Sequence, residues 1–477
     1  MGNSMDGDVD RLATAQATQT DAFRPEAVSL VHSKGKLTAR ERIAALLDDN
    51  TDVQYGTIAA RDQDGEWIPE AGGIDYVGTI AGHTVVASST DYTDHGGGYG
   101  AGRLGRLIAL AKEHRWPVVL FVDGGGSRAR HPRSGLGHLE LSGPIGPYSL
   151  FDGMAELSGW SPTVAIVSGP SFAGHASAAG FSDFLVATAG SSIGMGGPPM
   201  VEAALGVRMT AHELASVEMH DESGGIDLLV DDEPAAIEAA RRYLDFYHDL
   251  PASKVDRSEA HPQAARINDV TTTHERIDRL LDAGSFFELR RHFARAMITG
   301  LGRMGGKTVG ILANDSAIDD GFIDENAATK ASRFIEQCDA YSYPVVSLID
   351  TIGCGTRDDD GKPLPIPGRW HHRPIMAHHH RQTPLFAVQT GRARGLGAAV
   401  MAGFPTGQST MMLSVAWPEV ELGVDDGYAT VLNHASFDDV IAPAATREQI
   451  IRLLSHLGTS DDRRGSTTQK RHAIDTW

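Results

Sequence analysis

The chain has 477 residues, of which 41% are hydrophobic and 54 are glycine. Its formal net charge of −20 at pH 7 argues against a nucleic-acid binder and against a protein that docks on an anionic membrane surface. It has only two cysteines, no apolar run long enough to span a membrane and no N-terminal signal pattern, so we expect a cytoplasmic protein without a disulfide framework.

The first half of the chain alternates predicted helices with short, β-branched strands. Residues 1–23 are polar, and we expect a disordered leader there. A helical region is predicted within 24–50, where Thr38 and Glu41 have the spacing of an N-terminal capping box. The later predicted elements of this half are strand 84–88, helix 101–114, strands 118–122, 164–168 and 184–188, and helices 211–217 and 233–248.

Residues 250–266 form the predicted linker, because they combine proline and charge with little periodicity. The second half then repeats the order of elements. Its predicted elements are helix 273–282, strand 308–313, helix 326–340, strands 345–349 and 385–389, and helix 446–456. The strands are apolar throughout rather than alternating, which is typical of an α/β architecture with a buried sheet.

Three sequence matches between the halves indicate a duplicated domain. ERIAALLD at 41–48 returns as ERIDRLLD, GHTVVA at 82–87 as GKTVGI, and PVVLFVD at 117–123 as PVVSLID, each about 225 to 235 residues later. This offset far exceeds the period of solenoid repeats. We therefore predict two similar domains, at 24–250 and 265–465. We expect the functional site to lie where two such similar halves face each other.

Glycine-rich segments follow two strands of the first half, at 123–126 and at 169–180. Glycine leaves backbone N–H groups uncovered, and a helix N-terminus adds positive potential, so two such amides aimed at one point form an oxyanion hole. The simpler alternative is that these glycines only allow close packing. Ser127 and Ser171 lack the G-x-S-x-G context of a hydrolase nucleophile.

Several motifs resemble the carboxyltransferase (β) subunits of biotin-dependent acyl-CoA carboxylases, and they span residues 24–457 in order. DGGGSR at 123–128 stands where that family has Asp-Ser-Gly-Gly-Ala-Arg. The other matching segments are GKLTARERI at 35–43, GRMGGKTVGI at 302–311, KASRF at 330–334, AWP at 416–418 and DDVI at 438–441.

The resemblance implies two tandem crotonase-like domains, each a β/α spiral of the ClpP/crotonase type. It implies that the N-terminal domain binds acyl-CoA, or a carrier-bound acyl group, and that the C-terminal domain of a neighbouring subunit faces biotin. The resemblance also implies a homo-oligomer, either a dimer or a hexamer, with an active site between subunits. Because the chain has no Ala-Met-Lys-Met biotin site and no visible ATP-binding module, a separate biotin carrier and a biotin carboxylase subunit are the expected partners.

Carried over residue by residue, the resemblance places the thioester enolate on the amides of Gly125 and Gly126. It places the ureido oxygen of biotin on the amides of Leu396 and Gly397. Moving a carboxyl group between biotin and the α-carbon of an acyl thioester creates negative charge on both oxygens, so each hole stabilises one charge. No side-chain base is required, and decarboxylation alone would need only the thioester hole.

Departures from the family pattern cluster in the second half, where TIGCGTR at 351–357 replaces a Pro-Gly-Phe-Leu-Pro-Gly loop. The acyl-specificity Asp of the family falls at Ala399. In the first half, Ala173, Gly174 and His175 replace Gly-Gly-Ala. We regard His175 as a candidate for catalysis or substrate contact, with a packed core histidine as the alternative. Ala173, Gly174 and Ala399 are candidate substrate-binding residues.

Five histidines fall within residues 371–380, and three interpretations stay open. They line a polar pocket, they lie on a solvated helix, or His371 and His378 join Cys354 in a metal site. The i, i+4 spacing of helical metal pairs is absent and Pro374 interrupts, so we predict no metal. The candidate pocket-lining residues are His371, His372, His378, His379, His380 and Cys354.

Four arginines are candidates for the phosphates of coenzyme A, because a guanidinium matches a phosphate bidentately, with surface ion pairing as the alternative. They are Arg40, Arg42, Arg103 and Arg128. The predicted function is carboxyl transfer between biotin and an acyl thioester. The alternatives are a biotin-independent decarboxylase or related enolate enzyme with a rebuilt, histidine-rich pocket, and an inactive scaffold partner in a carboxylase complex.

Overall fold

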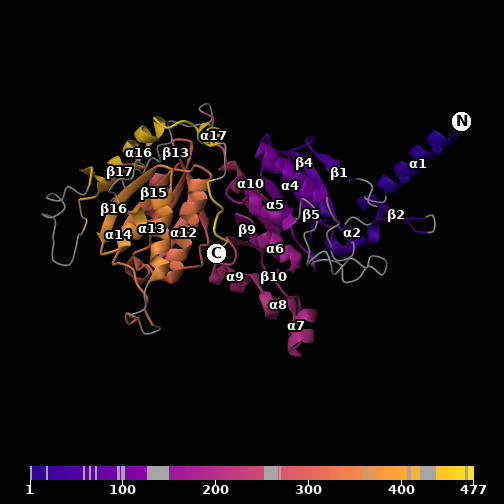
Figure 1. The fold of residues 1–477 in the computed structure, drawn as a ribbon, viewed down its shortest axis with the longest axis horizontal. Helices are drawn as coiled ribbons and strands as arrows, with labels where there is room; N and C mark the ends of the chain where they lie inside the picture. The colour runs from indigo at the N-terminus through magenta and orange to yellow at the C-terminus, as the bar shows by residue number, and fades with distance from the viewer. Residues whose placement is uncertain are drawn as a thin grey trace. The chain divides into compact units, whose positions relative to one another are not determined.

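The computed structural model describes residues 3–17, 20–56, 60–63, 66–69, 72–93, 97, 103–125, 150–251, 267, 270–358, 361–364, 368–404, 410–418, 420, 437–467 and 471–476. The chain forms two compact units, which are described separately (Figure 1). The first unit contains Met1–His220 and Leu228–Asp245, and the second contains Asp221–Asp227 and Phe246–Trp477. Most of the predicted linker at 250–266 lies outside the described residues.

The described part of the first unit is built on a seven-stranded sheet in the order β1-β4-β5-β6-β7-β9-β11. The first three strands pair antiparallel, and each later strand joins in parallel. β6, β7 and β9 are buried at every position, which explains their unbroken apolar sequence. The strands are β1 (Val53–Tyr55), β4 (Gly73–Ile80), β5 (His83–Thr90), β6 (Val118–Phe121), β7 (Thr163–Val167), β9 (Phe184–Thr188) and β11 (Leu228–Val230).

Helices and two small sheets complete the described first unit. The predicted capping box is confirmed: Glu41 N–H donates to Thr38 Oγ1 at 3.1 Å, and Thr38 N–H donates to the Glu41 carboxylate at 2.8 Å. The helices are α2 (Pro25–His32), α3 (Ala39–Leu46), α4 (Arg103–His114), α5 (Leu150–Leu157), α6 (Gly174–Gly180), α7 (Pro198–Leu205), α8 (Ala211–Ala215), α9 (Val217–Ser223, which continues into the second unit) and α10 (Glu233–Asp245). The small sheets pair β2 (Ala60–Gln63) with β3 (Glu66–Pro69) and β8 (Pro170–Phe172) with β10 (Ser192–Gly194).

The described part of the second unit repeats this plan with a seven-stranded sheet in the order β12-β13-β14-β15-β16-β17-β18. Again three strands pair antiparallel and the rest add in parallel. The same pairing pattern in both halves confirms the predicted duplication. The strands are β12 (Phe287–Leu289), β13 (Met297–Met304), β14 (Lys307–Asn314), β15 (Val345–Thr351), β16 (Leu385–Ala393), β17 (Met411–Ala416) and β18 (Asp439–Val440).

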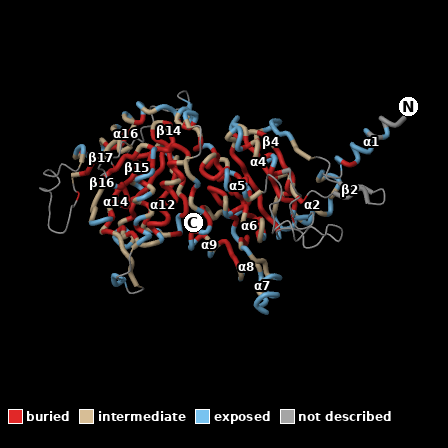
Figure 2. Tube along the Cα trace, in the orientation of Figure 1, coloured by how far each residue is buried: buried red, intermediate tan, exposed pale blue. Residues whose placement is uncertain are grey.

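The core of the second unit includes fully buried side chains from four neighbouring strands, among them Ile311, Val346, Phe386 and Val415, together with Ile277 of α11. Figure 2 shows the buried residues concentrated in the strands, whereas α7 is largely exposed. The helices of this unit are α11 (Thr273–Leu280), α12 (Glu325–Ala340), α13 (Arg369–His380), α14 (Gly397–Ala402), α16 (Thr446–Ser455) and α17 (Ser460–Gly465).

Two predictions about local structure are corrected. The expected disordered leader contains helix α1 (Asn3–Ala17), in which Ala15 is buried, so at least one contact supports it. Residues Arg369–His380 form one helix although Pro374 lies inside it. Proline there lacks the N–H that would bond to the carbonyl four residues earlier, and its ring crowds that carbonyl, but the helix continues to His380.

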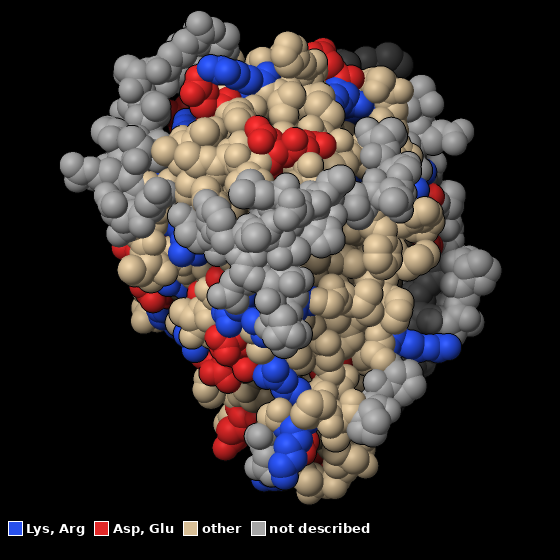
Figure 3. All heavy atoms as spheres, turned by 90° about the vertical axis from the view of Figure 1, so that its left-hand side faces the viewer, with Lys and Arg blue, Asp and Glu red and all other residues tan. Residues whose placement is uncertain are grey.

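Among the described residues, no helix combines the length and apolar character needed to cross a bilayer. On the face shown in Figure 3, the basic side chains of the described residues lie interspersed with acidic ones.

Candidate functional site

The first candidate site lies at the carboxyl end of β6. Gly124 is pinned to β8 because its N–H donates to the Pro170 carbonyl at 2.7 Å and its carbonyl accepts from Phe172 N–H at 2.8 Å. Gly125 follows as an exposed residue with no atom within 4 Å of the position that a Cβ would take. Within the described part of the chain its N–H has no hydrogen-bond partner. An uncovered, unbonded amide is what an oxyanion hole requires. Gly126 lies outside the described residues.

Helix α6 begins beside this loop. Gly124 bridges in parallel to Ser171, so Gly125 is a register neighbour of Phe172, and α6 starts two residues later at Gly174. Ala173 is the N-cap of α6 with φ 53° and ψ −119°. This conformation costs a non-glycine residue about 1–3 kcal/mol, which explains why glycine suits the position. The predicted substrate-binding residues Ala173 and Gly174 therefore lie next to Gly125.

His175 is buried behind Gly124 rather than facing an open pocket. Its Nε2 lies 2.8 Å from the Gly97 carbonyl, and since a carbonyl can only accept, Nε2 carries the proton. Burial lowers the pKa of His175, which keeps the ring neutral. The structure therefore favours the packed core histidine over direct contact with substrate.

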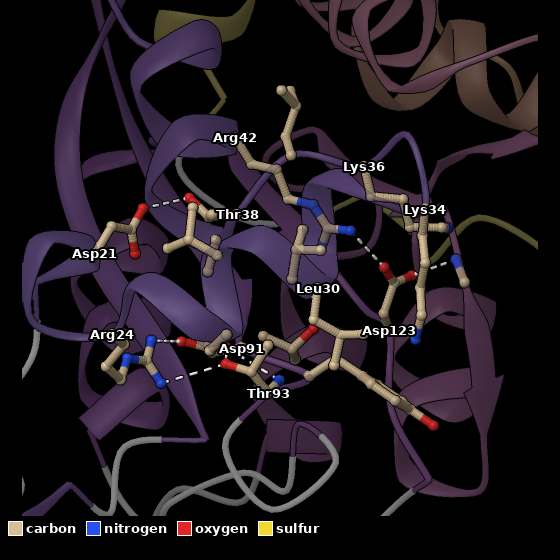
Figure 4. A pocket seen from close by; sticks show the side chains of 18 of the residues that line it. Asp21, Arg24, Leu30, Lys34, Lys36, Thr38, Arg42, Asp91, Thr93 and Asp123 are labelled. Carbon is tan, nitrogen blue, oxygen red and sulfur yellow. Dashed lines mark hydrogen bonds and ion pairs between the residues drawn. The ribbon is translucent and has the colours of Figure 1, made fainter.

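A cavity of about 500 Å³ borders this loop, with Asp123, Gly169 and Pro170 in its wall (Figure 4). Lys34 and Lys36 also line it, and neither side-chain ammonium makes a hydrogen bond or ion pair with any described residue. In Figure 4 both lysines lie on the Asp123 side of the cavity, away from Arg24 and Asp91. Among the described residues, no carboxylate lies within 4 Å of either ammonium, although Lys36 is close enough to Asp123 to influence its ionisation.

Arg42 is structural, which corrects its predicted role at a phosphate. It donates to Asp123 at 2.7 Å, to Ser168 Oγ at 2.8 Å and, through Nε, to Glu233 at 3.0 Å. The side chain is almost fully buried, and the carboxylates of Asp123 and Glu233 neutralise its charge. Burial opposes ionisation of Asp123, but Arg42 and Lys36 hold the pKa of that carboxyl below its usual range.

The other predicted arginines give no free phosphate ligand in the described residues. Arg40 pairs with Asp21 at 3.1 Å and with Asp91 at 3.5 Å. Arg128 and the side chain of Arg103 lie outside the described residues. Sequence reasoning missed Lys34 and Lys36, although Lys36 belongs to the GKLTARERI segment that carried the resemblance.

The second candidate site is the start of α14. Gly397 is buried, and its N–H donates to the Arg394 carbonyl at 3.2 Å. A Cβ on Gly397 would lie 2.8 Å from Cγ2 of Thr351 and 3.0 Å from Cα of Gly353. Leu396 is 48% exposed, and its N–H has no partner among the described residues. Two backbone amides were predicted to bind the ureido oxygen of biotin. Among the described residues, the N–H of Leu396 has no partner and could donate to a ligand, whereas the N–H of Gly397 already donates to the Arg394 carbonyl.

An apolar cavity of about 390 Å³ lies beside Leu396. Ala399 is part of its wall, and of the described residues that line it only Gln389 and Ser414 have polar side chains. Alanine at this position leaves the cavity free of the carboxylate that the family pattern would place there. The pocket suits an apolar group with one hydrogen-bond acceptor.

The histidines of α13 divide between two faces. His371 is buried with Nε2 3.1 Å from the Ile323 carbonyl, and His378 is fully buried with neither ring nitrogen hydrogen-bonded. Burial and the nearby Arg381 lower the pKa of His378 to about 3. His372, His379 and His380 are exposed.

Cys354 is a free, half-buried thiol whose pKa is raised by burial. Among the described residues, no three His, Cys, Asp or Glu side chains gather in a group that could hold a metal ion. The alternative of a metal bound by His371, His378 and Cys354 therefore has no support in the part of the chain that is described.

Comparison with known proteins matches residues 30–432 to the carboxyl transferase domain family. The chain is 31% identical over 391 residues, 78% of this chain and 74% of the relative, to the uncharacterized carboxylase YngE of Bacillus subtilis. It is 26% identical to the methylmalonyl-CoA decarboxylase alpha subunit of Veillonella parvula, over 91% of this chain and 92% of the relative. The crystal structure of transcarboxylase 12S, a hexamer with hydrolyzed methylmalonyl-coenzyme A bound, aligns with a TM-score of 0.81 at 25% identity over 98% and 97% of the two chains.

Proposed function

The chain belongs to the carboxyl transferase domain family, and from that premise we propose that it moves a carboxyl group between biotin and the α-carbon of an acyl-CoA. The observation that carries this proposal is the exposed amide of Gly125, which has no hydrogen-bond partner among the described residues and follows two positions after Asp123 in the wall of the 500 Å³ cavity. In this role the chain is the carboxyltransferase component of an acyl-CoA carboxylase or transcarboxylase.

On the thioester side, Lys34 and Lys36 bind the phosphates of coenzyme A, and the Gly125 amide donates to the thioester oxygen as negative charge develops there. One such donor typically lowers the barrier by about 3–4 kcal/mol. His175 acts on this site indirectly, because its ring supports Gly124 and ties Gly97 to the same loop.

On the other side, the residues present fit biotin. The Leu396 amide can donate to a ureido oxygen, and the apolar cavity beside it can enclose the fused rings. Biotin supplies the carboxyl group when it arrives on a separate carrier protein, which a biotin carboxylase subunit would charge. The Gly397 amide, which is bonded to Arg394, holds the turn that presents Leu396.

A homo-oligomer, dimer or hexamer, with its active site between subunits is part of the proposal. The segment around α7 exposes Met195, Met200, Leu205 and Val207, each at least 49% accessible, and such apolar groups mark a contact surface. We place the protein in the cytoplasm, since both cysteines are free thiols in the structure.

A biotin-independent decarboxylase is the second candidate, because the Gly397 amide is engaged and a decarboxylase subunit is among the relatives. The test incubates the purified chain with malonyl-CoA, methylmalonyl-CoA and a panel of acyl-CoAs, with and without carboxylated biotin carrier. Carrier-dependent transfer supports the proposal, and turnover without carrier supports the decarboxylase. Absence of turnover in every mixture supports the scaffold alternative.

A further inference from the structure

A third cavity, of about 680 Å³, lies within the second unit between α12, α13 and the last residues of the chain. It shares no lining residue with the apolar cavity beside Leu396. The carboxyl transfer proposed above does not use it.

The wall formed by α13 is basic. Arg369, His372, Arg373, Met376 and His380 line the cavity at positions i, i+3, i+4, i+7 and i+11, so they share one face of the helix. The side chain of Arg369 makes no hydrogen bond or ion pair with any described residue. The exposed imidazole of His372 lies with Nδ1 3.0 Å from the Gly368 carbonyl, and the exposed ring of His380 lies edge-on to that of His379.

The acidic side chains of the cavity already have partners. Asp339 is 2% exposed and accepts from the N–H groups of Gln382 and Thr383 at 2.7 and 2.9 Å. It also pairs with Arg471 at 3.3 Å and His472 at 3.1 Å.

The second acidic group is equally occupied. Glu336 accepts from the backbone N–H of Asp475 at 3.0 Å, and the Asp475 carboxylate pairs with Arg373. The arginines 373 and 471 are thus matched by protein carboxylates, whereas Arg369 and two imidazoles are not.

We propose that this cavity binds a small anion with several phosphate or carboxylate groups, held by Arg369 and His372 near the start of α13. A guanidinium matches such oxygens with charge-assisted hydrogen bonds, and an imidazolium N–H adds a second donor. Glu336, Asp339, Arg373, Arg471 and His472 face the same space, but their mutual pairs persist.

Isothermal titration calorimetry on the whole chain tests this site with pyrophosphate as the phosphate probe and citrate as the carboxylate probe. We expect at least one probe to bind, with at least a tenfold loss of affinity in Arg369→Ala and a smaller loss in His372→Gln.

His379→Gln is the matched control, since His379 does not line the cavity, and it should bind like the unmodified chain. The Lys34→Ala, Lys36→Ala variant removes the lysines that we propose bind the phosphates of coenzyme A, and it should keep the binding that Arg369→Ala loses. The proposal is overturned if neither probe binds, or if the affinity of Arg369→Ala equals that of the unmodified chain. Thermal melts of each variant establish that it folds.

Discussion

The imidazole of His175 occupies the space that a side chain on Gly124 would need. A Cβ on Gly124 would lie 2.5 Å from Cε1 and 2.6 Å from Nε2 of His175. The same Nε2 holds the Gly97 carbonyl at 2.8 Å. The contact between His175 and Gly124 therefore determines where the loop leaves the sheet and where the amide of Gly125 lies.

Gly124→Ala should destabilise the chain by about 1–3 kcal/mol, because the new methyl group meets the imidazole. The φ of Gly124 is outside the left-handed region, so the backbone itself tolerates alanine. Adding His175→Ala should recover part of this loss, so the double variant unfolds at a higher urea concentration than the sum of the single effects predicts. Strict additivity in the four-variant cycle would show that the two residues do not touch.

Arg42→Leu should lower the free energy of unfolding by about 3–5 kcal/mol, because it leaves the buried carboxylates of Asp123 and Glu233 without their cation. Urea unfolding measures the change. Arg208→Leu is the control, since Arg208 makes an exposed ion pair with Glu202 and should contribute less than about 1 kcal/mol. Equal unfolding midpoints for Arg42→Leu and the unmodified chain would refute the structural role.

Lys34→Ala with Lys36→Ala should raise the KM for an acyl-CoA about tenfold, the equivalent of about 1.4 kcal/mol. The KM for the matching acyl-pantetheine, which lacks the nucleotide phosphates, should not change. Steady-state kinetics with both substrates checks this, and the effect should shrink at high salt because exposed charges are screened. An equal rise for both substrates would place the lysines elsewhere than at the phosphates.

His378→Leu should reduce the amount by which the free energy of unfolding decreases as the pH is lowered. The pKa of His378 is about 3 in the folded chain and 6.5 in the reference state, so between these values the unfolded chain binds the extra proton and stability falls as the pH falls. From pH 7.5 to 5.5 this contributes about 1.4 kcal/mol of loss.

Urea unfolding at both pH values measures this loss, with His379→Leu as the exposed control on the same helix. If His378→Leu loses as much stability as the unmodified chain over this range, the group is not buried and neutral.

Features that depend on neighbouring residues were predictable from the sequence. The capping box of Thr38 and Glu41 needs only a three-residue spacing, and the strand predicted at 184–188 is β9 because every position in it is buried. The glycine loop was found for the same reason, since Gly124 and Gly125 follow directly on an apolar strand.

Roles that depend on distant partners were not predictable. Arg42 stands in a motif that suits a phosphate ligand, but its partners Asp123 and Glu233 lie 81 and 191 residues away, and only the fold brings them together. His175 was ambiguous because its partner Gly97 is 78 residues away. Helix α13 was obscured by Pro374, which the helix contains nonetheless, with His371 and His378 on its buried face.

The central claim is that a backbone amide, that of Gly125, stabilises the enolate. Its most direct test compares the carboxyl transfer rates of Gly125→Ala and Gly125→Pro. Alanine keeps the N–H and enters open space, whereas proline removes the donor. We expect Gly125→Ala to retain its rate and Gly125→Pro to lose about 100–1000-fold in kcat, with both variants folded. A folded Gly125→Pro variant with an undiminished rate would contradict the account.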